Sequence, residues 1–151
     1  MRMSTRGRFG LRALLHLAVC ERDTPVPAAA LAKKMGISAD YLMQLLVRLR
    51  RAGLVKSARG PRGGFKLGKK PARISVGDIV RAVEGPIAVT DCLDHSQRVR
   101  MSHGKPTKPC AKRANCIARL VWQRLSDDIT VLLDHSDLQQ ILDDARRRRL
   151  L

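Results

Sequence analysis

The 151-residue sequence predicts a mainly α-helical fold, a winged helix-turn-helix with a two-stranded β wing and a long C-terminal helix. Three observations support it: leucines at helical spacing, two amphipathic segments joined by a glycine, and a glycine-rich turn between short apolar segments. Residues 1–73 hold 17 Lys and Arg against 3 acidic residues, whereas residues 74–151 hold 13 against 10. This asymmetry favours a polyanionic partner for the N-terminal half, with a solvated basic face as the alternative.

The first element expected is a buried helix over residues 6–22, because its Phe, Leu, Ala and Val residues recur in a largely helical pattern. His16 and Cys20 lie within this apolar segment. We interpret both as core or rim residues, and Cys20 as a small buried hydrophobic side chain.

A helix-turn-helix is expected next. Residues 28–35 form a short Ala-rich helix that ends at Gly36, and Ser38 is a good N-cap for the following helix. The apolar stripe of that second helix consists of Leu42, Leu45, Leu46 and Leu49. A separate polar and basic face consists of Tyr41, Gln44, Arg48 and Arg51. This pattern is typical of a helix that packs on its neighbours and reads DNA.

A β-hairpin should follow directly. Residues 54–58 and 65–67 are short apolar segments on either side of a tip, residues 59–64, in which five of the six residues are Gly or Arg and the other is Pro61. Arg59 and Arg62 at this tip can reach phosphates or the minor groove. Three helices followed by a hairpin are the order of a winged DNA-binding domain.

The C-terminal half predicts three further helices. Residues 74–84 form a short helix, residues 116–133 a long one with an apolar side, and residues 137–149 a last one with a capping box of Ser136 and Gln139. The intervening segment has no periodicity and is too long for a mere connector. We therefore divide the chain into a winged helix-turn-helix domain (1–84), a cysteine-bearing loop (85–115) and a C-terminal helical part (116–151).

The loop segment carries the residues with the most distinctive chemistry. Cys92, Cys110 and Cys116 are spaced C-x17-C-x5-C. Thiolates are soft ligands that suit iron–sulfur clusters and zinc, and exposed thiols also respond to oxidation. The candidates for a fourth ligand are His95, His103, Asp91, Asp94, or an exogenous water or thiol.

Several other classes of protein are disfavoured. The chain contains no run of about 18 apolar residues, and its first ten residues lack the apolar core of a secretory signal, so we expect a cytoplasmic protein without a membrane span. No nucleophile–base arrangement, phosphate-binding loop or paired catalytic carboxylates stand out, which argues against an enzyme. A nucleoid-type protein that coats DNA without a signal remains an alternative, as does a zinc-binding or thiol-redox regulator.

Over essentially its whole length the sequence resembles the IscR/NsrR-type iron–sulfur transcription regulators. The resemblance rests on MRMSTRGRFGLRALLHLA, GISADYLMQLLVRLRRAGLVKSARGPRGGFKL and VGDIVRAVEG, followed by three cysteines and a helix with VWQRLSD. It implies a homodimer held by the long C-terminal helix and bound to a pseudo-palindromic operator in double-stranded DNA. It implies DNA contacts from Ser38, Tyr41, Gln44, Arg48, Arg59 and Arg62.

The resemblance also implies that an iron–sulfur cluster, 2Fe–2S or 4Fe–4S, is held by Cys92, Cys110 and Cys116 and modulates DNA binding, either as a redox-sensing repressor or as an activator. Two positions depart from the family pattern. Members with a histidine ligand carry it three residues after the last cysteine, where this chain has Arg119. Members that use an acid from the partner's N-terminal segment carry it near position 8, which here is Arg8. The fourth ligand is therefore open, with His103 or His95 the candidates within the loop.

Overall fold

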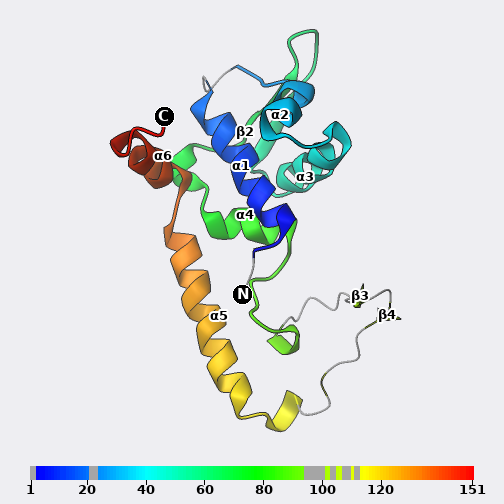
Figure 1. Ribbon diagram of the computed structural model, residues 1–151, viewed down its shortest axis with the longest axis vertical. Helices are drawn as coiled ribbons and strands as arrows, with labels where there is room; N and C mark the ends of the chain where they lie inside the picture. The colour runs from blue at the N-terminus through cyan, green and yellow to red at the C-terminus, as the bar shows by residue number, and fades with distance from the viewer. Residues whose placement is uncertain (1–2, 21–23, 94–100, 103–104, 107–109, 111–112) are drawn as a thin grey trace.

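The computed structural model describes residues 3–20, 24–93, 101–102, 105–106, 110 and 113–151. Its α-helices are α1 (Thr5–Val19), α2 (Ala28–Met35), α3 (Ala39–Arg51), α4 (Val76–Val83), α5 (Ala118–His135) and α6 (Leu138–Arg147). Its strands are β1 (Val55–Ala58), β2 (Gly64–Leu67), β3 (Met101–Ser102) and β4 (Lys105–Pro106), and its 3-10 turns are η1 (Pro71–Arg73), η2 (Asp91–Leu93) and η3 (Arg113–Asn115). Helices α1–α4 and α6 gather around one core together with the β1–β2 hairpin, whereas α5 extends away from it (Figure 1).

Helix α1 begins at an N-cap serine, because the Ser4 hydroxyl accepts hydrogen bonds from the backbone N–H groups of Arg6 and Gly7. The structure places its last helical residue at Val19, inside the predicted range of 6–22. The helix buries Ala13, Leu14 and Leu17 in the core, and both His16 and Cys20 are half-buried at its rim.

The helix-turn-helix is confirmed in its details. Helix α2 ends at Gly36, whose φ of 67° lies in the left-handed region that favours glycine. The Ser38 hydroxyl then accepts a hydrogen bond of 3.2 Å from the backbone N–H of Tyr41 and so caps α3. The four leucines predicted for the buried stripe, Leu42, Leu45, Leu46 and Leu49, are each at most 1% exposed.

The predicted wing is also present. Strands β1 and β2 pair antiparallel from Val55 opposite Leu67 to Ala58 opposite Gly64. The linker before α2 joins this hairpin, since Val26 and Phe65 exchange two backbone hydrogen bonds of 2.9 Å. The wing is therefore tied to the first two helices as well as to α3.

Helix α4 packs across α1 at close range. Its start is fixed by a capping box of Ser75 and Asp78, two residues later than the predicted start at 74. A Cβ atom at Gly10 would lie 3.3 Å from Val83, so a glycine at this position allows the two helices to approach closely. The C-terminal end of α4 and the N-terminal half of α1 therefore meet beside α3.

The prediction for the last helix was wrong about its cap. Asp137 and Gln140 form the capping box of α6, whereas the hydroxyl of Ser136 donates to the carbonyl of Leu132 at 2.8 Å and so remains bound to the end of α5. Helix α5 begins and ends two residues later than the predicted range of 116–133. The chain then turns back, and Leu138 enters the core fully buried, its N–H donating to the carbonyl of Ile74 at 3.0 Å.

Within the described parts of the chain, no helix has the length and hydropathy needed to cross a lipid bilayer.

Candidate DNA-binding face and cysteine segment

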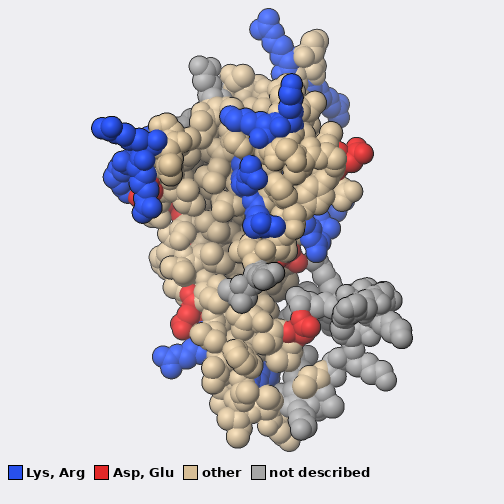
Figure 2. Space-filling view, viewed as in Figure 1, with Lys and Arg blue, Asp and Glu red and all other residues tan. Residues whose placement is uncertain are grey.

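Positive charge gathers on the winged domain. Lys and Arg side chains are spread over the upper part of the view in Figure 2, whereas the surface formed by α5 below it is mainly uncharged. This matches the charge asymmetry of the sequence, and it places the basic surface on the part of the molecule that contains α3 and the wing.

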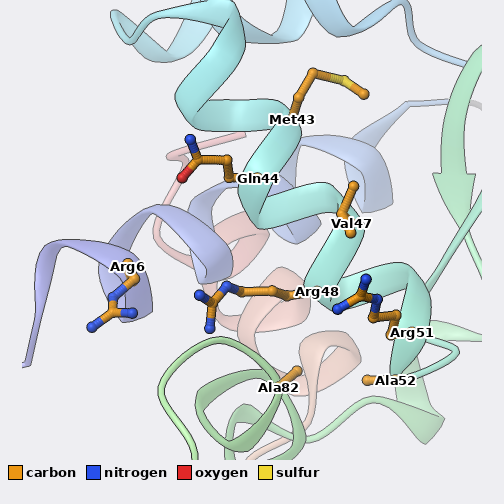
Figure 3. A pocket seen from close by; sticks show the side chains of 8 residues that line it. All are labelled: Arg6, Met43, Gln44, Val47, Arg48, Arg51, Ala52 and Ala82. Atoms are coloured by element: carbon orange, nitrogen blue, oxygen red, sulfur yellow. The ribbon is translucent and has the colours of Figure 1, made fainter. Parts of the chain in front are cut away.

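A groove with a volume of about 980 Å³ runs along the exposed side of α3 (Figure 3). Three helices line it: Arg6 from α1 and Ala82 from α4 lie beside the α3 residues Met43, Gln44, Val47, Arg48 and Arg51 and the adjacent Ala52. Three arginines and a glutamine thus converge on one open surface. Such a surface can hold a polyanion and present hydrogen-bond donors and acceptors to it.

Of the residues predicted to contact DNA, Gln44 and Arg48 line this groove, as does Arg51 of the predicted polar and basic face. Gln44 and Arg51 are exposed. Arg48 is half-buried, and its Nη1 donates to the carbonyl of Val83 at 3.4 Å, at the end of α4. Arg48 therefore has a structural contact in addition to any contact with a ligand.

Tyr41 and Ser38 lie differently. The Tyr41 ring is half-buried and packs edge-on against Phe9, with ring centroids 6.1 Å apart and an interplanar angle of 84°. The Ser38 hydroxyl is exposed but serves as the α3 cap. Neither residue lines the groove.

Sequence reasoning missed five of the lining residues, Arg6, Met43, Val47, Ala52 and Ala82. A signal for Met43 and Val47 was available, because at 100° per residue they project away from the leucine stripe of α3. Arg6 had no such signal, since α1 and α3 are brought together only by the tertiary fold.

The wing arginines Arg59 and Arg62 are both exposed at the hairpin tip. The tip turns at Gly60, whose φ is 109°, and is closed by a 2.8 Å hydrogen bond from the N–H of Gly63 to the carbonyl of Gly60. The two guanidinium groups are thus free of the core and project from a short, closed turn.

The segment with the first cysteine is anchored on α5. The N–H of Val89 donates to the hydroxyl of the buried Ser126 at 3.1 Å, and Leu93 is 6% exposed. Between them, the Cys92 Sγ lies 3.2 Å from the Thr90 hydroxyl oxygen and is half-buried. A movement of the Cys92 segment would therefore be transmitted to the middle of α5.

The other two cysteines lie near the start of α5. Cys116 is half-buried, and its carbonyl accepts a 3.1 Å hydrogen bond from the N–H of Arg119; Cys110 is exposed. All three thiols are free.

Among the described residues, no three His, Cys, Asp or Glu side chains gather closely enough to hold a metal ion. His95, His103 and Asp94 lie outside the described residues, and Asp91 is exposed in η2.

Arg119 has an unusual environment. Its Nε is buried and has no hydrogen-bond partner among the described residues, one turn after Cys116. A buried guanidinium N–H without an acceptor is costly and suits an anionic neighbour. A cation one turn after Cys116 fits the negative charge of a thiolate-ligated iron–sulfur cluster, although the cation itself is no ligand. Arg8, the other departure from the family pattern, is exposed on α1.

Helix α5 leaves an apolar stripe uncovered. Ile117, Val121, Leu125 and Leu132 project from one side of the helix, with exposed fractions of 84%, 57%, 41% and 67%. Within this chain the opposite side carries the contacts, including the buried Ser126.

Comparison with known proteins identifies relatives along nearly the whole chain. A family model, Rrf2, described as an iron-dependent transcriptional regulator, matches residues 3–144. The HTH-type transcriptional regulator IscR of Aliivibrio salmonicida is 37% identical over 144 residues, which are 95% of this chain and 79% of the relative.

Two solved structures share the fold. T. potens IscR is 33% identical with a TM-score of 0.70, over 96% of this chain and 88% of that one. CymR, the global cysteine regulator of B. subtilis, is 34% identical with a TM-score of 0.69, over 93% and 95%. With a winged helix-turn-helix, a basic face on α3 and these relatives, the chain belongs to the Rrf2 family of transcriptional regulators.

Proposed function

We propose that this regulator acts as a homodimer that binds a pseudo-palindromic operator and that an iron–sulfur cluster on Cys92, Cys110 and Cys116 modulates its DNA binding. The observation that carries the DNA-binding part is the groove on α3, where three arginines and Gln44 converge on an open surface. A recognition helix of this kind enters the major groove, and Gln can pair with adenine and Arg with guanine.

The wing would supply contacts outside the major groove. Arg59 and Arg62 project from its tip and suit the phosphates or the adjacent minor groove. Ser38 and Tyr41 lie at the start of α3, where a hydroxyl can bind phosphate, although each also has a contact within the fold. Arg48 likewise has two contacts to serve: one guanidinium nitrogen donates to the carbonyl of Val83, and the side chain also lines the groove.

The dimer is supported by the apolar stripe of α5. This stripe would be covered by the same stripe on α5 of a second copy, because a two-fold symmetric pair of helices buries identical surfaces against each other. With α5 at the centre, the two winged domains would lie on either side and could each enter one half of a palindrome.

The cluster is supported by the chemistry and placement of the cysteines. Three free thiols lie between the winged domain and α5, and the buried Nε of Arg119 lies one turn from Cys116. A bound cluster would supply redox- and ligand-sensitive iron to this segment. The residues themselves would hold it, neutralise part of its charge through Arg119, and connect it to α5 through Val89 and Ser126.

Two measurements test these parts separately. Selection of binding sites from random duplex DNA should enrich one pseudo-palindromic sequence. A pool that shows no enrichment, together with a steep salt dependence of binding, would instead support a nucleoid-type coating protein. Protein purified without oxygen, and after reconstitution with iron and sulfide, should absorb visible light and contain both elements. A colourless protein with neither would contradict the cluster.

A second candidate for the sensing chemistry is a thiol or zinc switch on the same cysteines. The missing ligand favours it, because residue 119 has no imidazole where family members with a histidine ligand carry one, which leaves the cluster with three protein ligands from the cysteines. A structural neighbour, Staphylococcus aureus CymR, was also solved in an oxidized form, at 30% identity and a TM-score of 0.67. Zinc analysis and thiol titration of the isolated protein, before and after oxidation, separate these alternatives from the cluster.

A further inference from the structure

Two apolar side chains lie along one side of the otherwise polar and cationic face of α3. Met43 is 38% exposed and Val47 is half-buried, and both line the groove together with Gln44, Arg48 and Arg51. Figure 3 shows Met43 and Val47 on successive turns along one side of the exposed face, with Gln44 and Arg48 on the side nearer Arg6. The face is therefore divided into an apolar strip and a hydrogen-bonding strip.

The core does not explain this apolar strip. The buried stripe of α3 is complete without it, since the four leucines that face α1, α2 and α4 are at most 1% exposed. Met43 and Val47 project away from that stripe into the open groove. An apolar pair at this place on a DNA-facing helix points to an apolar feature of DNA.

The major groove offers one such feature. Each base pair presents donors and acceptors there, but only thymine presents a methyl group, at C5. Four residues of α-helix rise about 6 Å, which is close to two base-pair steps at about 3.4 Å each. Met43 and Val47 are thus spaced to contact methyl groups on base pairs about two steps apart in one half-site.

We propose that Met43 and Val47 read the C5-methyl groups of thymine in each half-site, while Gln44 and the arginines beside it read or bind polar groups. The proposal rests on the DNA-binding function above and adds a specificity-determining pair to it. It assigns a ligand, the thymine methyl group, to Met43 and Val47, the two α3 residues lining the groove whose side chains donate no hydrogen bonds.

The test removes the methyl group alone. In the operator obtained by selection, each thymine of one half-site is replaced in turn by deoxyuridine, and the dissociation constant is measured by fluorescence anisotropy at fixed salt. Loss of one buried methyl group should weaken binding about fourfold, and only at one or two positions. In Met43→Ala or Val47→Ala, thymine and deoxyuridine at the corresponding position should bind equally well.

Matched controls separate this effect from folding and from general weakening. Val19→Ala truncates an exposed valine (47%) on α1, away from the groove, and should retain the full deoxyuridine penalty. Val47→Ser removes both γ-methyl groups and leaves a small polar side chain, so it should also abolish the penalty at the position that Val47 contacts.

The outcomes are distinct. If a preferred operator is found but no thymine in it responds to deoxyuridine, or if the penalty persists in both Met43→Ala and Val47→Ser, the methyl-reading proposal is overturned while the regulator stays sequence-specific. If no operator is enriched at all, the sequence-specific function itself fails, and this inference fails with it.

Discussion

Arg81 of α4 binds the carboxylate of Asp134, near the end of α5, through both of its terminal nitrogens at 2.5 and 3.3 Å. The hydrogen bond to Asp134 is the main reason that the pKa of Arg81 is raised, with Asp78 adding to it. Gly77 on α4 leaves room for this pair, because a Cβ atom there would lie 1.9 Å from the Asp134 Oδ1. The pair joins the winged domain to the helix that would carry the dimer contact.

We therefore expect Asp134→Asn to loosen the angle between α4 and α5. Binding to a full operator should weaken by at most about fivefold, since exposed ion pairs contribute roughly 0.2–1 kcal/mol. Binding to an isolated half-site should be unchanged, because α3 itself is intact. Gly77→Ala should have the same effect by displacing the carboxylate.

Asp143→Asn is the matched control for this experiment, because it removes a half-buried carboxylate whose bonds, to Arg146 and Gln139, stay within α6. Equal losses on the full operator and the half-site would show that the Arg81–Asp134 pair does not set the spacing of the two domains.

Leu125→Glu should dissociate the dimer. Leu125 lies in the exposed apolar stripe of α5, and a symmetric interface would lose two buried leucines at once. The dimer dissociation constant should rise by about a hundredfold, as measured by sedimentation equilibrium. Gln123→Glu adds the same charge on another side of α5, where Gln123 bonds to Asp127, and should leave the dimer intact. A Leu125→Glu protein that remains dimeric would place the interface elsewhere.

Arg119→His should lengthen the lifetime of a reconstituted cluster. The substitution supplies a neutral imidazole one turn after Cys116, and imidazole is a ligand for iron whereas guanidinium is not. The measurement is the rate at which visible absorbance decays in air, with Arg124→His on the exposed surface of α5 as the control. Equal decay rates for the wild type, Arg119→His and Arg124→His would count against a cluster site beside residue 119.

Two arginines in the groove should behave differently. Arg48→Ala removes the bond to the Val83 carbonyl and should lower the free energy of unfolding by about 1 kcal/mol as well as weaken DNA binding. Arg51→Ala should weaken DNA binding with no change in stability, because Arg51 is exposed in the groove. Urea unfolding and anisotropy on the same samples distinguish the two. Identical stability losses would mean that the contact of Arg48 with α4 does not stabilise the fold.

His16 predicts a dependence of stability on pH. Burial lowers its pKa below the usual 6.5, and the nearby charges of Lys34 and Arg12 lower it further. Because the unfolded chain then binds a proton more readily than the folded one, this stabilising contribution is complete above about pH 6.5 and is lost as the pH falls through the lowered pKa. His16→Gln should therefore lose less stability than the wild type between pH 7.5 and 5, as measured by urea unfolding. Parallel losses would assign the pH dependence to other groups.

The sequence alone was sufficient for the features that depend on near neighbours in the chain. Ser38 and Gly36 mark the ends of helices because their capping and left-handed conformation are local properties. The leucine stripe of α3 follows from helical spacing, and the glycine-rich tip follows from turn chemistry. For the same reason the winged helix-turn-helix and its basic half were predicted correctly.

The sequence alone was not sufficient where two neighbouring residues could both cap the same helix. Ser136 and Asp137 both precede α6, and both are good caps. The structure selected Asp137, because the Ser136 hydroxyl is bound to the carbonyl of Leu132 and the strand-like bridge between Ser75 and Asp137 fixes where the chain turns. Leu138 then reaches the core, where its backbone N–H donates to the carbonyl of Ile74. No periodicity in the last helix indicates this contact.

Only the tertiary structure decided which part of α3 remains open. Periodicity separates the leucine stripe from everything else, but it cannot tell which polar residues are covered by neighbours. Phe9 covers one side of Tyr41, and the end of α4 engages Arg48, so the open face is centred on Met43, Val47 and Arg51. The sequence thus determined that α3 presents a surface to DNA, whereas packing against α1 and α4 determined which side chains form it.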